Sequence, residues 1–210
     1  MIDFMKSEYQ KLNDKLNELG VPNHEFLSVK GTSVDTLVNT KWPRKPYAEI
    51  LLEYLPKLSK NEQETVVRAL SVKGNNVACN PLLEMFYSKE TYSKTFLWVV
   101  GNALSIINDK SSYPEIIEIC KNQKNGIARQ MLFLMVLPRI KTDEAYQVLL
   151  DGLNDKDVKG HALDGLGKFG NIDAIDVIEN IEVEKGKNEF KAKERALKKL
   201  RKKLEQRKVQ

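Results

Sequence analysis

Apolar residues recur along most of this chain at spacings of three and four, which place side chains on one face of an α-helix. The first such segment covers residues 2–19. Its apolar positions are Phe4, Met5, Tyr9, Leu12, Leu16 and Leu19. Gly20 followed by Pro22 indicates where this helix ends, because glycine favours the turn after a helix and proline cannot continue one. We therefore expect an amphipathic N-terminal helix.

Residues 21–47 are predicted to be irregular, since proline and glycine interrupt them repeatedly. One short helix is expected inside this segment, around residues 34–39, with Thr32 or Ser33 as its N-cap. Asn125-Gly126 lies between two predicted helices, so the chain shows no β-hairpin signal of the Asn-Gly type.

From residue 46 onwards the helical pattern repeats in pairs. First helices are expected to begin 33, 33, 31 and 29 residues apart, at Ala48, Pro81, Pro114, Ala145 and Ala174. Second helices are expected over residues 62–72, 93–107, 126–140, 157–169 and 189–204. Ile107, Ile140 and Phe169 hold the same position in three of these second helices. A period near 30 with two helices per unit is typical of an α-solenoid.

The clearest unit covers residues 158–174. Its defining positions are Val158, Lys159, Ala162, Leu163, Leu166, Gly167, Phe169, Gly170, Asn171 and Ala174. This spacing resembles the short bacterial HEAT repeat, the type also seen in phycobilisome-lyase HEAT-like proteins; residues 99–108 and 127–132 match it more loosely. The resemblance covers residues 46–182 and implies a curved helical array that binds other proteins, with second helices on its concave face.

The expected fold is therefore all-α, an α-solenoid of about five HEAT-like helix pairs with an N-terminal capping helix. Residues 1–45 are predicted to be a cap of one helix and an irregular segment packed on the array. Residues 46–182 are predicted to form the array, and residues 183–210 a basic capping helix and tail.

Composition indicates a folded protein with a substantial core, because 41% of the 210 residues are hydrophobic and 30% are charged. No apolar run approaches the length of a membrane span, and the first residues show no secretion signal. Cys79 and Cys120 are expected to be buried free thiols. These features together predict a cytoplasmic protein.

The positive charge is concentrated near the C-terminus. Residues 185–208 hold twelve Lys and Arg against three Glu, a net charge of +9, so the remainder carries 5 − 9 = −4. A last second helix that caps the array explains this segment; contact with nucleic-acid phosphates, an anionic membrane surface or an acidic protein is the alternative. The high overall pI therefore says little about the acidic body.

Polar or aromatic residues on the second helices, off the apolar stripe, are the best binding candidates on a concave face. They are Arg68, Trp98, Asn102, Arg129, Gln130, His161 and Asp164. Trp and Arg dominate binding hot spots, and Trp98 and Asn102 share a helix face. A structural role is possible for each: Trp98 in the core, Arg129 paired with a carboxylate of a neighbouring repeat, Asn102 on a backbone group.

Glycines at 160, 165 and 167 in one predicted helix need a reason, since glycine destabilises a helix. Close packing of the next repeat is one reason, and close approach of a partner is the other.

Motifs of enzymes and metal sites do not occur: there is no Cys-x-x-Cys, His-Glu-x-x-His, Gly-x-Gly-x-x-Gly or phosphate-binding lysine loop. The acidic stretch 151–157 lacks the glycine and final glutamate of a calcium-binding EF-hand loop, and Asp157 is expected to be an N-cap. No catalytic residues, metal ligands or cofactors are predicted.

The sequence thus favours a non-enzymatic scaffold that binds a protein or peptide on its concave face. The alternative is a nucleic-acid-binding protein, similar in size and helical build to the HEAT-like DNA-alkylation-repair glycosylases. That class lines a groove with aromatic residues and a catalytic carboxylate, whereas Asn102 stands one turn from Trp98 here. A lyase-like accessory that handles a pigment is a third possibility, suggested by the repeat type.

Overall fold

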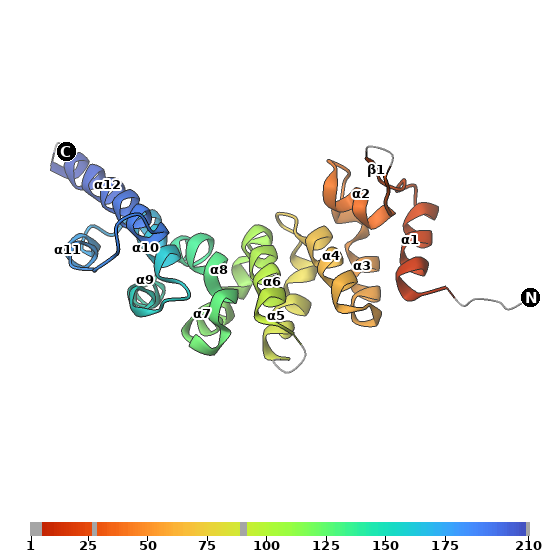
Figure 1. Ribbon diagram of the computed structural model, residues 1–210, viewed down its shortest axis with the longest axis horizontal. Coiled ribbons are helices and arrows are strands. Elements are labelled where there is room, and N and C mark those ends of the chain that lie inside the picture. Colours follow the sequence, from red (N-terminus) through yellow and green to blue (C-terminus); the bar gives the residue numbers. More distant parts are fainter. Residues whose placement is uncertain (1–5, 27–28, 89–91, 209–210) are drawn as a thin grey trace, which may run out of the picture.

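The computed structural model of the protein describes residues 6–26, 29–88 and 92–208. In these ranges the chain forms twelve α-helices, joined by short 3₁₀ turns, and one two-stranded ladder. The all-α class is thereby confirmed. Figure 1 shows the helices in a bowed row, with the two ends of the chain at opposite ends.

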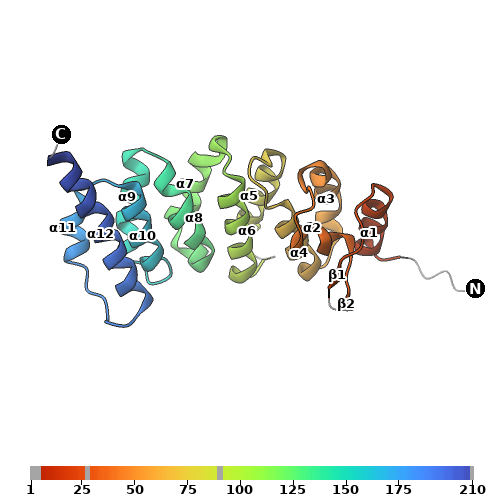
Figure 2. The ribbon, with the colours of Figure 1, turned by 90° about the horizontal axis from the view of Figure 1, so that it is seen from above.

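The helices alternate between two sides of the row. The odd-numbered helices are α1 (Glu8–Glu18), α3 (Ala48–Tyr54), α5 (Cys79–Tyr87), α7 (Tyr113–Lys121), α9 (Asp143–Asp151) and α11 (Ala174–Glu179). The even-numbered helices are α2 (Ser33–Asn39), α4 (Lys60–Leu70), α6 (Lys94–Ile107), α8 (Gln130–Met135), α10 (Lys159–Phe169) and α12 (Asn188–Lys208). Even helices contact one another in unbroken succession from α2 to α12. They lie on the inner side of the bow, side by side in Figure 2.

The N-terminal helix is present where the apolar spacing predicts it, from residue 8 onwards, and Phe4 and Met5 lie outside the described residues. Ser7 and Gln10 form a capping box at its start, and Gly20 follows its end with a φ of +88°. The short helix α2 begins after Thr32, whose hydroxyl accepts the Asp35 N–H as expected of an N-cap.

An antiparallel ladder was not predicted in the irregular segment. Strand β1 (Glu25–Phe26) pairs with β2 (Val29–Lys30), and the His24–Gly31 backbone bond of 2.8 Å continues the pairing. The ladder lacks an Asn-Gly turn, which is the signal that sequence reasoning looks for.

The helix starts agree closely with the repeat pattern: α3 and α11 begin at Ala48 and Ala174, and the other first helices begin one or two residues early. The second helix predicted over 126–140 is wrong as a continuous element. It is divided into a 3₁₀ segment (Gln123–Arg129), α8 and a second 3₁₀ turn (Leu137–Arg139). Gly126, with φ +54° and ψ −133°, cannot join the helix, and Pro138 lacks the N–H that would extend it.

The start of α10 also differs from expectation. Val158 is its N-cap and provides no side-chain hydrogen bond, so the prediction of Asp157 as N-cap is wrong. The Asp157 N–H instead donates to the Asp155 carboxylate over 2.9 Å, in a turn before the helix.

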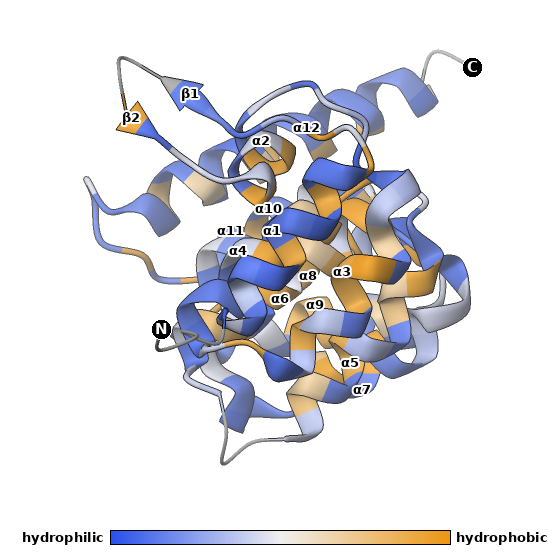
Figure 3. Ribbon diagram, turned by 90° about the vertical axis from the view of Figure 1, so that its right-hand side faces the viewer, coloured by the Kyte–Doolittle hydropathy of each residue, from blue (hydrophilic) through white to orange (hydrophobic). Residues whose placement is uncertain are grey.

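One apolar core runs through the described helices, and the view along the row in Figure 3 shows hydrophobic segments where helices face one another. Two glycines permit this packing. A Cβ at Gly165 would lie 2.6 Å from the Phe133 carbonyl oxygen of α8, and one at Gly167 would lie 2.9 Å from the Ala196 Cα of α12. Helix α10 therefore contacts both neighbours backbone to backbone, which explains two of its three glycines.

Candidate functional site

The exposed side of the even-numbered helices carries most of the sequence-predicted residues. We call this surface the inner face; its exposed and half-buried residues are Glu64, Arg68, Trp98, Asn102, Ile106, Gln130, His161, Asp164, Lys168 and Lys199. The odd-numbered helices lie on the opposite side of the even row (Figure 1), so the helices that carry these residues line the side that bends inward. They fall into separate groups along the row.

Trp98 and Gln130 form a linked pair across α6 and α8. The Trp98 Nε1–H donates to the Gln130 Oε1 over 3.1 Å, and the Gln130 Nε2–H donates to the Asp157 carbonyl oxygen over 2.7 Å. The indole is half-buried and packs against the core with part of its ring. The pair thus combines a structural role with a fixed aromatic surface on the inner face.

Arg129 is buried, with 2% of its surface exposed, and lies beneath the inner face. Its guanidinium donates to the carbonyl oxygens of Gly126 and Cys120 over 3.1 and 3.0 Å and forms an ion pair with Asp155. Burial raises the pKa of Asp155, but hydrogen bonds from Arg129 and the Asp157 N–H together lower it below its ordinary value. This ion pair joins the unit of α7 and α8 to the turn before α10.

Arg68 and Asn102 lie at a groove between α4 and α6, which we call the α4–α6 groove. It encloses about 270 Å³ and is lined by Val38, Arg44, Arg68, Ser71, Val99, Asn102, Ala103 and Ile106. Glu64 accepts two hydrogen bonds from Arg68, at 3.2 and 2.7 Å, which neutralises that charge.

In the part of the chain that the structure describes, two side chains of this groove are not satisfied by contacts within the fold: one hydroxyl lacks a hydrogen-bond partner, and one apolar side chain stays exposed. Ser71 is 8% exposed, and its hydroxyl has no hydrogen-bond partner among the described residues. Ile106 is 41% exposed although it follows an apolar stripe. Arg44 reaches the rim, where its Nη1–H donates to the Arg68 carbonyl oxygen over 3.3 Å. The Ser71 oxygen is enclosed, so it is an unpaired buried group of the fold and not a contact point for a ligand.

His161 and Asp164 lie on one stripe of α10 but do not form a catalytic pair. Arg195 of α12 donates two hydrogen bonds to the Asp164 carboxylate, at 2.9 and 2.6 Å. Burial lowers the pKa of His161, and the nearby charges of Asp164 and Glu189 oppose that shift. The imidazole is therefore neutral at pH 7, while the Asp164 carboxylate beside it is paired with Arg195.

Both thiols are buried and free, as the sequence predicts. Burial raises the pKa of Cys79 and Cys120, so neither thiol is a ready nucleophile. The described ranges hold no group of three His, Cys, Asp or Glu side chains placed to bind a metal ion. None of the helices in those ranges combines the length and apolar character that a membrane crossing requires.

A cluster of basic residues at the ends of the second helices was missed by sequence reasoning. We call it the basic edge; its members are Arg139, Lys141, Lys168, Lys199 and Lys203, all exposed. A signal for it existed, because Arg139 and Lys168 each precede a residue that marks the repeat register, Ile140 and Phe169. Counting charge over the C-terminal tail alone hid this alignment.

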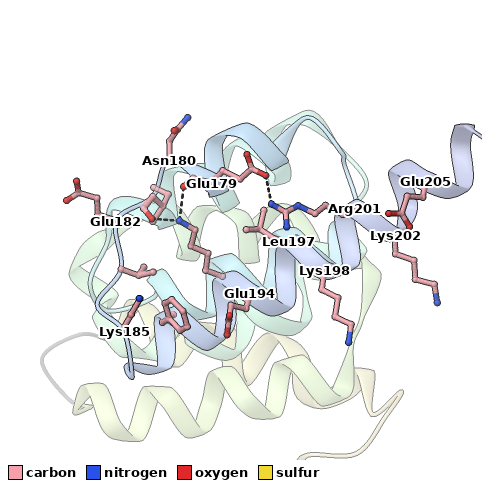
Figure 4. A pocket seen from close by; sticks show the side chains of 14 residues that line it. Glu179, Asn180, Glu182, Lys185, Glu194, Leu197, Lys198, Arg201, Lys202 and Glu205 are labelled. Atoms are coloured by element: carbon pink, nitrogen blue, oxygen red, sulfur yellow. Dashed lines mark hydrogen bonds and ion pairs between the residues drawn. The ribbon is translucent and has the colours of Figure 1, made fainter.

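The largest cavity lies on the other side of α12, away from every sequence-predicted candidate. Figure 4 shows its walls, formed by α11, the following loop and α12, and it encloses about 1310 Å³. Glu179 and Arg201 form an ion pair of 2.7 Å across it, and the Lys193 Nζ donates to the Glu179 and Ile181 carbonyl oxygens. This groove is the side of the last described helix pair that no further described helix covers.

No family model matches the chain, and neither a curated protein nor a solved structure matches it.

Proposed function

We propose that the chain is an α-solenoid of HEAT-like pairs that acts as a non-enzymatic scaffold and binds a segment of another protein in the α4–α6 groove. The observation that carries this proposal is the exposed Ile106 in a groove that Arg44 and Asn102 also line. Polar groups next to an apolar surface are the usual composition of a recognition site.

The solenoid part of the proposal is supported by the order of contacts. Each even helix packs on the next along the chain, and one core extends over all the pairs. In a repeat array each unit contacts chiefly its neighbours, and the row of closer contacts lies on the inside of the curve. The bow in Figure 1 has the even helices on that side.

The expected occupant is an extended segment that carries an apolar side chain beside a carboxylate. Val38, Val99 and Ile106 offer an apolar floor, while Arg44 offers donors at one end. Trp98 lies one helical turn before Asn102 and extends the contact surface toward α8. Tryptophan and arginine next to a pocket are typical of binding hot spots.

The lining also supports binding without a reaction. The eight lining side chains include no carboxylate, imidazole or thiol. Ser71 therefore lacks a base to activate it, which a nucleophilic hydroxyl requires.

Selection from a random peptide display library on the immobilised full chain tests this proposal. We expect enriched peptides to carry an acidic residue within one or two positions of an apolar one. Ile106→Asp should weaken their binding at least tenfold, since it adds a like charge and removes the apolar contact. Val177→Asp is the matched control, because Val177 is 42% exposed on α11, away from the groove. Equal binding to both variants, or no enrichment, would contradict the proposal.

A further inference from the structure

The basic edge brings together cations from three consecutive parts of the row. Arg139 and Lys141 follow α8, Lys168 lies in the last turn of α10, and Lys199 and Lys203 lie on α12. All five are exposed, and they lie on or beside the inner face. Residues up to 64 positions apart in the sequence, Arg139 and Lys203, therefore contribute to one patch.

Hydrogen bonds fix where these cations lie. The Lys141 Nζ donates to the Phe169 carbonyl oxygen over 2.7 Å, and the Lys203 Nζ donates to the adjacent Gly170 carbonyl oxygen over 2.5 Å. The Lys168 Nζ reaches the Leu134 carbonyl oxygen of α8 over 3.2 Å. Two ammonium groups thus meet at the end of α10, and a third bridges to the preceding second helix.

Arg139 repeats this arrangement one unit earlier. Its Nη1–H donates to the Ser105 carbonyl oxygen over 3.1 Å and to the Asn108 side chain over 2.7 Å, at the end of α6. Contacts at helix C-termini account for the hydrogen bonds of Arg139, Lys141, Lys168 and Lys203. An ammonium has three donors and a guanidinium five, so these contacts leave most donors of the basic edge unused.

The charge of the basic edge is not neutralised by the protein. Among the described residues, no carboxylate lies within ion-pair distance of any of the five. The carboxylate of Asp164 is already held by Arg195. Burial, then the charges of Lys199 and Arg139, lower the pKa of Lys168 despite the attraction of Asp164. The cations therefore repel one another, and an anion that bridges them would relieve that repulsion.

The cations on α12 also follow a regular line. Lys191, Arg195, Lys199 and Lys203 are four residues apart, so they lie on one stripe with an axial rise of about 6 Å between neighbours. Arg195 is paired with Asp164, and the three lysines leave a row of cations that suits a linear polyanion. It suits the core of a protein–protein interface poorly, since charged residues are depleted there.

We propose that the basic edge binds the phosphate backbone of a nucleic acid. Contacts of this kind depend on Lys and Arg and need no reading of base sequence. A lipid surface fits less well, because the edge offers no exposed aromatic side chain for insertion.

Binding of a fluorescein-labelled 20-base-pair DNA duplex and of a 20-nucleotide single-stranded RNA to the full chain, followed by anisotropy at several salt concentrations, tests the proposal. We expect binding at low salt and a plot of log affinity against log salt with a slope of about −3.5 to −4.5 for five phosphate contacts. The triple variant K168Q/K199Q/K203Q should bind more than about tenfold more weakly at 100 mM salt, since three such contacts are lost.

The control removes the same charge away from the basic edge. K185Q/K187Q/K198Q changes two exposed lysines of the loop before α12 and one lysine on the side of α12 that lines the cavity of Figure 4, and it should weaken binding less than threefold. K168R/K199R/K203R keeps the charge and should bind like the wild type, which separates loss of contact from loss of helix capping. Circular dichroism melting of each variant checks the fold.

Three outcomes would overturn the proposal. One is absence of binding to either nucleic acid at 50 mM salt. Another is an equal loss in the two glutamine variants, which would assign the binding to general positive charge. The third is equally tight, edge-dependent binding to polyglutamate or to phosphatidylserine vesicles, which would assign the surface to an acidic protein or to a membrane.

Discussion

The α4–α6 groove and the basic edge are two regions of one surface, yet they differ in charge and in the nature of their free groups. In the groove, Glu64 neutralises Arg68, and the group left for a ligand is the exposed apolar side chain of Ile106. At the basic edge, Lys168 and its neighbours lack carboxylate partners among the described residues. Desolvation would drive binding at the first region, and counterion release would drive it at the second.

Equivalent positions of the repeat produce this difference. Ile106, Arg139 and Lys168 each precede the residue that fixes the register of their unit, Ile107, Ile140 or Phe169. All three are exposed at the end of a second helix. A single repeat position thus carries an apolar side chain in one unit and a cation in the next two. The fold sets the position of this side chain, and the residue type in each unit determines whether the surface there is apolar or basic.

Loss of the Arg129–Asp155 ion pair, which joins the unit of α7 and α8 to the turn before α10, should have the largest effect. Arg129→Ala leaves the Asp155 carboxylate and two carbonyl oxygens without their partner in a largely buried site. Breaking such a pair costs about 3–5 kcal/mol, which urea unfolding measures. Arg68→Ala is the control: its pair with Glu64 is exposed and should contribute less than about 1 kcal/mol. Similar losses in the two variants would show that burial does not make the Arg129 pair more important than a surface pair.

The helices themselves could be predicted because their signals are local. Apolar spacing, proline at first turns and the glycine after α1 define short stretches without reference to distant parts of the chain, and α3 and α11 begin at the expected residues. The segment around α8 could not be predicted, because its periodicity continues through Gly126 and Pro138 while the backbone does not. An apolar pattern indicates which side chains are buried. A 3₁₀ turn can bury the same side chains as an α-helix, so the pattern does not distinguish the two.

The candidate site was less predictable, because its properties depend on pairs of residues far apart in sequence. Nothing local distinguishes Arg129, which is buried with Asp155, from Arg139, which stays exposed. The unpartnered hydroxyl of Ser71 likewise depends on how α4 packs against α6. Exposure and pairing depend on the tertiary structure. The residue types alone therefore indicated candidates, but not which of them are buried and which are exposed.

A second prediction concerns the close contact of α10 with α8, which holds the basic edge in place. Gly165→Ala would put a Cβ 2.6 Å from the Phe133 carbonyl oxygen and 2.7 Å from Leu149, and overpacking of this kind costs about 1–3 kcal/mol. Gly160→Ala is the matched control on the same helix, since its nearest neighbour would be 3.8 Å away. That variant should gain up to about 1 kcal/mol from helix propensity. Thermal denaturation of both would show opposite signs, and a loss in both would contradict the packing account.

Acid should weaken the same junction by a smaller amount. The pKa of Asp155 is lowered in the folded state, so its contribution to stability is complete above the pKa of the unfolded chain and is lost as the pH falls through the folded value. We expect Asp155→Asn to reduce the fall in unfolding free energy between pH 5 and pH 3, measured by urea titration. An unchanged pH profile in this variant would show that other carboxylates account for the acid sensitivity.

The smallest effect tests the two regions against each other directly. Ile106→Lys places a cation at the equivalent repeat position and should extend the basic edge by one phosphate contact. The slope of log affinity against log salt for the DNA duplex should then steepen by about 0.9, while peptides selected for the α4–α6 groove lose their apolar contact and bind more weakly. Because Ile106 is 41% exposed, the change should leave stability within about 0.5 kcal/mol of the wild type.

Val177→Lys adds the same charge on α11 and should leave both the slope and peptide binding unchanged. If Ile106→Lys alters peptide binding alone, the groove is a site but the nucleic acid does not reach along the inner face to α6. If it alters neither, the shared repeat position has no part in recognition, and the two regions act through residues outside that register.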